Sequence, residues 1–177
     1  METKVTRERL ITFLLETPMF EKLEPSEIME MIHIVEVEMY KAGDIIFKEG
    51  DTGYAWYVLY HGAVDVLKHG ASGEKKIISL GPQACFGEIS ILDGSPRSAT
   101  IRATEDSVVF RVPRGAFAEL IDNGHLVAYK LLHHMAILLA ERQRTTTLRL
   151  SELLKASEIT DVHEGIRTIV GESSVRE

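Results

Sequence analysis

The fold of this chain is most constrained by a series of short β-rich runs between residues 35 and 112. In the first run, residues 35–40, Val and Met alternate with Glu and Tyr, which predicts a strand with one apolar face and one wet face. Most of the runs are separated by turns that contain glycine, and no long helical pattern intervenes. The later runs are residues 45–47, 54–60, 63–68, 75–80, 99–103 and 107–112. This spacing indicates an antiparallel β-roll or jelly roll, also described as a double-stranded β-helix.

Helical patterns lie on both sides of the β region. Before it, residues 5–34 predict N-terminal helices, because Pro18 must end a first helix and Pro25 is typical of the first turn of a second. After it, residues 114–155 predict a short helix followed by a long C-terminal helix. The fold class is therefore expected to be mainly β with flanking helices.

The predicted long helix runs from about His125 to about Lys155 and contains neither Pro nor Gly. Residues 1–155 are then one domain, in which residues 35–113 form the β-roll. Residues 156–177 are polar and carry two basic and five acidic side chains. We expect them to form a loosely ordered acidic tail.

Charge and cysteine content exclude several classes of protein. The 177 residues include 20 Lys and Arg against 27 Asp and Glu, a net charge of −7, which argues against a protein that coats nucleic acid. The single cysteine, Cys85, excludes an internal disulfide and a four-cysteine zinc site, and it fits a cytoplasmic setting. No apolar run approaches the ~20 residues that span a bilayer, so no membrane association is expected.

Residues 85–100, with the sequence CFGEISILDGSPRSAT, differ from an ordinary turn. Residues 89–92 can form one helical turn with free N–H groups, and Gly87 allows a ligand to approach the backbone closely. The following Gly-Ser-Pro reverses the chain and returns Arg97 to that turn, which suits a phosphate. Glu88 would be repelled by the phosphate unless it accepts a hydrogen bond from a hydroxyl, such as that of a ribose. Taken alone, a Glu and an Arg at this separation would usually form a surface salt bridge.

The same segment closely resembles the phosphate-binding cassette of cyclic nucleotide-binding domains of the Crp/Fnr type. That cassette reads Phe-Gly-Glu, a short apolar helix, and then Pro-Arg-x-Ala-Thr. The resemblance extends over roughly residues 18–150. The upstream matches are Gly43-Asp44, Ile46, Glu49-Gly50-Asp51, Tyr57 and Gly62.

The resemblance implies a role for several residues. Glu88 would accept the ribose 2′-hydroxyl, and Arg97 would pair with the exocyclic oxygens of the cyclic phosphate. Backbone amides near Gly87, Ser98 and Ala99 would complete the phosphate site. The other expected ligand contacts are Phe86 and Ile89 in the cassette, Val66 and Ile78 as apolar walls, and Arg142 and Thr145 on a long helix that closes over the purine.

The resemblance also bears on the ligand and the output. Ser98 stands where cGMP-selective members often have Thr, which favours cAMP over cGMP. The chain offers no nucleophile–base pair, phosphate loop or metal-ligand spacing, so we expect no enzymatic activity, no metal and no cofactor besides the bound nucleotide.

A seam of apolar and polar residues recurs at steps of three and four along the long helix. Its members are Leu132, Ala136, Leu139, Gln143, Thr146, Leu150 and Leu153. The seam favours a homodimer, although the same face could instead pack on the chain's own β-roll.

The 22 residues after Lys155 are too few for a DNA-binding domain, so we expect no DNA binding by this chain alone. It is either a sensor that controls an unknown partner protein or a piece of a longer chain. An interaction or dimerisation module that keeps the fold without binding nucleotide is the alternative.

Overall fold

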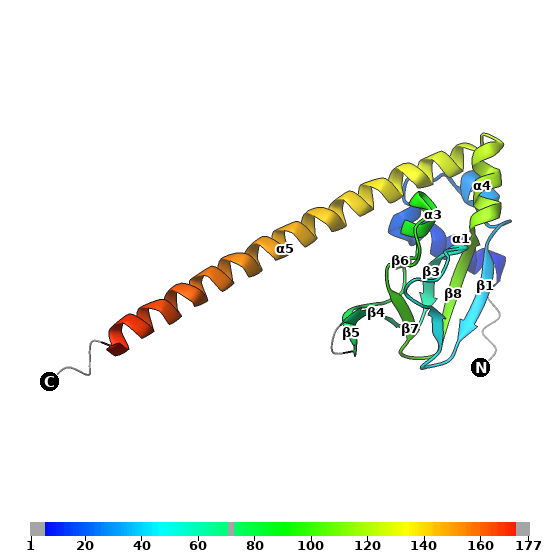
Figure 1. Ribbon diagram of the computed structural model, residues 1–177. Helices are drawn as coiled ribbons and strands as arrows, with labels where there is room; N and C mark the ends of the chain where they lie inside the picture. Colours follow the sequence, from blue (N-terminus) through cyan, green and yellow to red (C-terminus); the bar gives the residue numbers. More distant parts are fainter. Residues whose placement is uncertain (1–5, 71–72, 173–177) are drawn as a thin grey trace. The chain divides into compact units, whose positions relative to one another are not determined.

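The computed structural model describes residues 6–70 and 73–172. Contacts divide the chain into two compact units, the first ending at Met135 and the second beginning at Ala136, and each is described by itself. The first unit contains the N-terminal helices, the β-roll and the start of the last helix (Figure 1). Its N-terminal elements are α1 (Arg7–Glu16), the 3₁₀ helix η1 (Pro18–Phe20) and α2 (Pro25–Met31).

Two four-stranded antiparallel sheets form the β-roll. One has the strand order β1-β8-β3-β6 and the other the order β2-β7-β4-β5. The strands are β1 (Glu36–Tyr40), β2 (Ile45–Phe47), β3 (Ala55–His61), β4 (Val64–Gly70), β5 (Gly73–Leu80), β6 (Cys85–Phe86), β7 (Thr100–Ala103) and β8 (Ser107–Pro113). The predicted fold class, an antiparallel β-roll with flanking helices, is confirmed.

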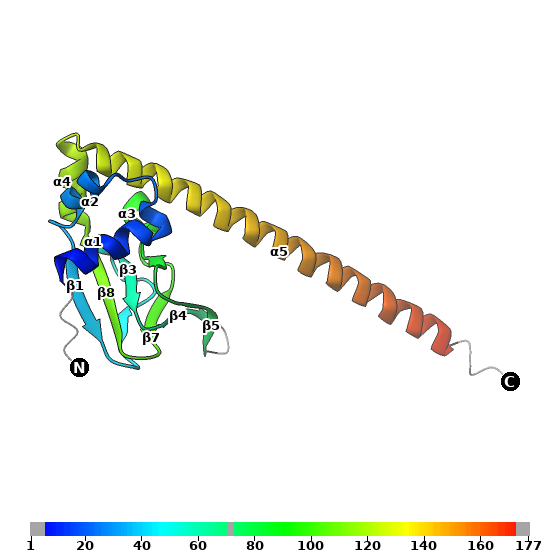
Figure 2. The same ribbon diagram turned by 180° about the vertical axis from the view of Figure 1, so that it is seen from behind.

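The central strand β3 is buried on both faces. Its inner face contributes Tyr57 and Leu59 to a core between the sheets. On the outer face, the Trp56 ring stacks on Phe20 with a centroid distance of 5.9 Å. Phe13 of α1 meets Tyr60 at 4.9 Å, so α1 covers this sheet (Figure 2). A strand covered on both sides explains the nearly continuous apolar run that β3 has in the sequence.

Strand β1 forms as predicted, but its faces are the reverse of those expected. Val37 is 47% exposed and Met39 is 71% exposed, whereas Glu38 and Tyr40 are half-buried. The Tyr40 hydroxyl donates to Glu38 at 2.6 Å, and Arg111 of β8 forms an ion pair with the same carboxylate at 3.5 Å. The carboxylate face therefore turns inward because an arginine on the neighbouring strand binds it.

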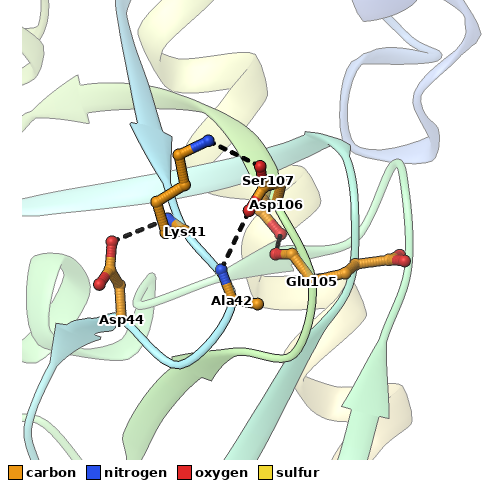
Figure 3. A network of polar contacts seen from close by, with 6 residues as sticks. All are labelled: Lys41, Ala42, Asp44, Glu105, Asp106 and Ser107. Carbon is orange, nitrogen blue, oxygen red and sulfur yellow. Dashed lines mark hydrogen bonds and ion pairs between the residues drawn. The ribbon is translucent and has the colours of Figure 1, made fainter. Parts of the chain in front are cut away.

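Two turns that cross from one sheet to the other are tied together (Figure 3). Asp106, between β7 and β8, accepts hydrogen bonds from Lys41 Nζ at 2.7 Å and from the Ala42 amide at 3.2 Å. The Lys41 amide donates to Asp44 at 2.7 Å within the turn between β1 and β2. These bonds hold the two sheet-crossing turns at a fixed separation.

Two helices follow the β-roll, α4 (Arg114–Asp122) and α5 (Leu126–Glu172). The left-handed Gly124 lies between them, with φ +75°. The tail predicted for residues 156–177 overlaps α5, which continues to Glu172. No proline interrupts residues 126–172, so a helix that has already nucleated can extend through a polar segment. Residues 173–177 lie outside the described part.

The first three turns of α5 pack tightly in the first unit. Val127, Ala128, Leu131 and Met135 are fully buried. None of the described helices is long and apolar enough to cross a membrane.

Candidate ligand-binding site

The cassette is built on two left-handed glycines on either side of a short helix. Strand β6 ends at Phe86, and Gly87 follows with φ +79°. Glu88 stands at the N-cap position of α3 (Ile89–Asp93), and Gly94 ends this helix with φ +75°. The helical turn predicted from the sequence at residues 89–92 is therefore present.

Arg97 is returned to the start of this helix by backbone and side-chain hydrogen bonds. Its amide donates to the Asp51 carbonyl at 2.8 Å. Its Nη1 donates to the Gly87 carbonyl at 2.7 Å, and its Nη2 donates to the Ala55 carbonyl at 2.6 Å. The predicted chain reversal thus places the guanidinium against Gly87.

The Arg97 side chain is a buried cation that forms no close ion pair with the described residues. Its exposed fraction is 4%, and no ion pair of the described residues includes it. Its Nε has no hydrogen-bond partner in the described part of the chain. Burial lowers the pKa of Arg97, against the opposing influence of Tyr57, Asp51 and Glu88. Because a buried cation is costly without an anion, this site favours an anionic ligand.

Glu88 is the second charged side chain of the cassette that is buried, with an exposed fraction of 4%. Both Glu88 and Arg97 are buried, so neither lies at the surface, and the Glu88 carboxylate acts electrostatically to raise the pKa of Arg97. The backbone around them is tightly packed. A Cβ on Gly53 would lie 2.3 Å from Ser90 Cβ and 3.3 Å from Arg97 Nη1.

The other cassette residues differ in their exposure. Ser98 is exposed, and its carbonyl accepts a hydrogen bond from Lys68 Nζ at 2.8 Å. Ala99 is half-buried and Ile89 is 39% exposed, so both have surface that a ligand can contact. Phe86 is 4% exposed and stacks on Tyr57, with ring centroids 5.3 Å apart. Phe86 therefore belongs to the core beneath the cassette.

The two predicted apolar walls lie opposite each other on neighbouring strands. Val66 of β4 pairs with Ile78 of β5. Val66 is half-buried against the core, and Ile78 is 49% exposed. The register shifts directly after Val66, which leaves Ile77 without an opposite residue on β4.

Arg142 and Thr145 belong to the second compact unit, on α5. The Thr145 hydroxyl donates to the carbonyl of Glu141 at 3.0 Å, one helical turn earlier. Thr146 and Thr147 make the same kind of bond within the helix. The roles of Arg142 and Thr145 toward a ligand remain predictions.

Three residues that shape the site were not among the predicted contacts. Phe47 lies with its ring centroid 4.1 Å from Arg97 Cζ, and Tyr57 lies 5.8 Å from it. Gly53 provides the close backbone approach described above. Phe47 and Gly53 lie in β2 and the following turn, far from the cassette in the sequence, so no local pattern connects them with Arg97. No group of three or more potential metal ligands occurs among the described residues.

Comparison with known proteins agrees with this geometry. Residues 37–123 match the family model of the cyclic nucleotide-binding domain. The chain therefore carries a domain of the cyclic nucleotide-binding family, and its fold is that of the solved members.

Individual relatives lie in two groups of regulatory proteins. The chain is 35% identical to the cyclic AMP receptor protein of Thermus thermophilus over 138 residues, which cover 77% of this chain and 62% of that protein. It is 33% identical to the cAMP-dependent protein kinase regulatory subunit of Hypocrea atroviridis, over 68% of this chain and 26% of that protein. The chain thus spans less than two thirds of the length of these relatives.

Solved structures show the same fold. The crystal structure of the Thermus thermophilus catabolite activator protein superimposes with a TM-score of 0.69 at 34% identity, covering 77% of this chain and 62% of that one. A cyclic nucleotide-binding domain from Methylobacillus flagellatus gives a TM-score of 0.72 at 26% identity, covering 78% of this chain and 81% of that one.

Proposed function

We propose that this chain is a regulatory sensor that binds a cyclic nucleotide in the cassette, with cAMP preferred over cGMP. The observation that carries the proposal is Arg97, a buried guanidinium with an unpartnered Nε and no ion pair in the described part of the chain. A cyclic phosphate supplies the missing negative charge. Relatives whose names specify cAMP support the choice of nucleotide, as does Ser98 after the arginine.

The remaining cassette residues would then hold the rest of the ligand. Glu88 accepts the ribose 2′-hydroxyl, a role that suits a buried carboxylate near the bound phosphate. The exposed Ser98 and the half-buried Ala99 offer backbone amides to the phosphate. Val66 and Ile78 contact the sugar or the base.

Titration calorimetry with cAMP and with cGMP tests the proposal directly. The wild-type chain binds cAMP more tightly than cGMP. Arg97→Ala binds cAMP roughly 30- to 4,000-fold more weakly, because losing the partner of a buried charge costs about 2–5 kcal/mol. Arg102→Ala is the matched control, since Arg102 is a partly exposed arginine on β7 that pairs with Glu74.

Two results would contradict the proposal. Unchanged cAMP affinity in Arg97→Ala would rule out the cassette as the binding site. Absence of binding of either nucleotide to the wild-type chain would favour the alternative, an interaction or dimerisation module that keeps the fold alone.

We further propose that the ligand acts by shifting the flanking helices. Within the first unit, Lys130 of α5 contacts Glu27 of α2 at 2.7 Å, and His125 contacts Glu30 at 3.0 Å. These contacts make α2 move together with the start of α5, about the left-handed Gly124. A ligand that binds one arrangement better than another shifts the population toward it. Arg142 and Thr145 of α5 remain the predicted purine contacts.

The proposed output is control of a partner protein by a homodimer joined through α5, without DNA binding by this chain alone. Leu150 on the predicted seam is 56% exposed, which leaves apolar surface for a second copy. Light scattering with and without cAMP tests the oligomeric state. A particle of 19.8 kDa under both conditions would show that the chain is monomeric.

A further inference from the structure

The guanidinium of Arg97 lies on aromatic rings from two strands, and a third ring packs against these two. The Phe47 ring of β2 is 4.1 Å from Arg97 Cζ, and the Tyr57 ring of β3 is 5.8 Å away. Phe47 and Tyr57 contact each other at 5.7 Å, and Phe86 of β6 stacks on Tyr57 at 5.3 Å. We call Phe47, Tyr57 and Phe86 the aromatic shelf.

Tyr57 also joins two arginines. Its hydroxyl acts electrostatically to raise the pKa of both guanidinium groups, those of Arg97 and Arg111. Tyr57 pairs with Arg111 across β3 and β8, and Arg111 pairs with Glu36 across β8 and β1. Arg111 also forms ion pairs with Glu36 and Glu38. A continuous row of polar side chains therefore runs from the ligand site across three strands to the edge of the sheet.

This row restricts where the Arg97 guanidinium can lie. Two of its five N–H groups donate to the Gly87 and Ala55 carbonyls. Those two bonds fix one edge of the plane, and the face of the plane rests on the Phe47 ring. Tyr57, a residue that is only 7% exposed, lies beside the plane with its ring centroid 5.8 Å from Arg97 Cζ. Bidentate phosphate binding requires the plane in one orientation, so a fixed plane loses less entropy on binding.

Burial keeps the Tyr57 hydroxyl neutral under ordinary conditions. The pKa of Tyr57 is raised, mainly by burial and then by the Glu38 carboxylate, against the opposing influence of both arginines. A neutral hydroxyl can accept a hydrogen bond from one guanidinium without cancelling its charge. The full positive charge of Arg97 therefore remains for a phosphate.

We propose that Tyr57 and Phe47 are positioning residues of the cyclic nucleotide site, which act by holding the plane of the Arg97 guanidinium for the phosphate. The proposal rests on the proposed binding function. Both side chains act through Arg97, so their effect depends on the forked shape of that side chain.

The central variant is Tyr57→Phe, which removes the hydroxyl and keeps the ring in the shelf. We expect its affinity for cAMP in calorimetry to fall roughly 10- to 150-fold, the range for loss of one polar partner of a charged group. Tyr60→Phe is the matched control. Tyr60 lies on the outer face of the same strand, where its ring contacts Phe13 and Phe110. We expect Tyr60→Phe to bind cAMP with the same affinity as the wild-type chain.

A double-mutant cycle separates positioning from a general structural effect. Lysine has no planar fork, so Tyr57→Phe in an Arg97→Lys background weakens cAMP binding less than twofold. A structural role would lower the affinity by the same factor in both backgrounds and would lower the urea midpoint as well. Phe47→Leu also weakens binding, and Phe47→Tyr, which keeps a ring beneath the guanidinium, restores it.

The failure of this proposal is distinguishable from the failure of the binding function. If the wild-type chain binds neither cAMP nor cGMP, the binding function is wrong and the positioning role falls with it. If the wild-type chain binds cAMP and Tyr57→Phe binds it within twofold, the binding function stands and the positioning role is wrong. Equal losses in the two arginine backgrounds also overturn it.

Discussion

Replacement of Gly87 by alanine perturbs the site at the point where backbone and guanidinium meet. Gly87 has φ +79°, and a Cβ built on it lies 2.7 Å from Arg97 Nη1 and 3.4 Å from Arg97 Cζ. The methyl group therefore cannot be accommodated unless the guanidinium moves. Movement of Nη1 breaks its hydrogen bond to the carbonyl of Gly87 itself, which is 2.7 Å long.

Two costs follow from this geometry. A left-handed backbone conformation costs a non-glycine residue about 1–2 kcal/mol. Loss of a hydrogen bond from a charged donor costs about 1.5–3 kcal/mol more. We expect Gly87→Ala to lower the free energy of unfolding by about 2.5–5 kcal/mol in total. A displaced guanidinium also loses a hydrogen bond to the bound phosphate, at the same cost as the second one. We therefore expect the affinity for cAMP to fall roughly 10- to 150-fold.

Gly43→Ala separates the two costs. Gly43 has φ +93°, but a Cβ built there meets no atom within 4 Å. Urea unfolding of this control shows only the backbone strain, about 1–2 kcal/mol, and calorimetry shows unchanged affinity for cAMP. The reasoning is refuted if Gly87→Ala and Gly43→Ala are equally stable and Gly87→Ala binds cAMP as the wild-type chain does.

Two further predictions concern stability. Leu59→Ala empties a fully buried position in the core between the sheets, and we expect a loss of about 2–5 kcal/mol in urea unfolding; a loss below 1 kcal/mol would contradict the packing. Burial raises the pKa of Glu27, but hydrogen bonds from Lys130 and from the Glu24 amide outweigh it and lower the pKa below the usual 4.5. Because the folded-state pKa is the lower one, the stabilisation is complete above about pH 4.5 and is lost as the pH falls through the folded-state pKa. Urea unfolding of Glu27→Gln is therefore expected to differ from wild type at pH 7 and to converge with it toward pH 3, and a gap that widens in acid would contradict the assignment.

The sequence was sufficient for the order of the helices and of every strand except β6, and for the helical turn and chain reversal of the cassette. Both depend on local signals, because glycine and proline turns delimit the strands and the Gly-Ser-Pro after α3 reverses the chain toward Arg97. The surroundings of Arg97 could not be predicted in this way. Phe47 and Gly53 reach the guanidinium only because two sheets pack face to face, and nothing local in the sequence links them to it.

The reversed faces of β1 show how a buried charge can override an apolar pattern. Arg111 lies on the inner face of β8, because it pairs with the inward-facing Tyr57 of β3. The register of β1 places Glu36 opposite Arg111. A shift of one residue would place Val37 there, and the guanidinium would lose its carboxylates. Exposure of Val37 and Met39 is less costly than that loss.

The two inward arginines, Arg97 and Arg111, differ in how their charges are held. The Arg111 side chain is 23% exposed, and ion pairs join it to both Glu36 and Glu38. Arg97 is more deeply buried, at 4% exposure, and no carboxylate of the described residues pairs with it. If the counter-ion were needed only for folding, the more buried arginine would need it more. The fold instead holds Arg97 with carbonyl groups and aromatic rings, which fix its position without a close ion pair, and that is the arrangement a phosphate-binding arginine requires.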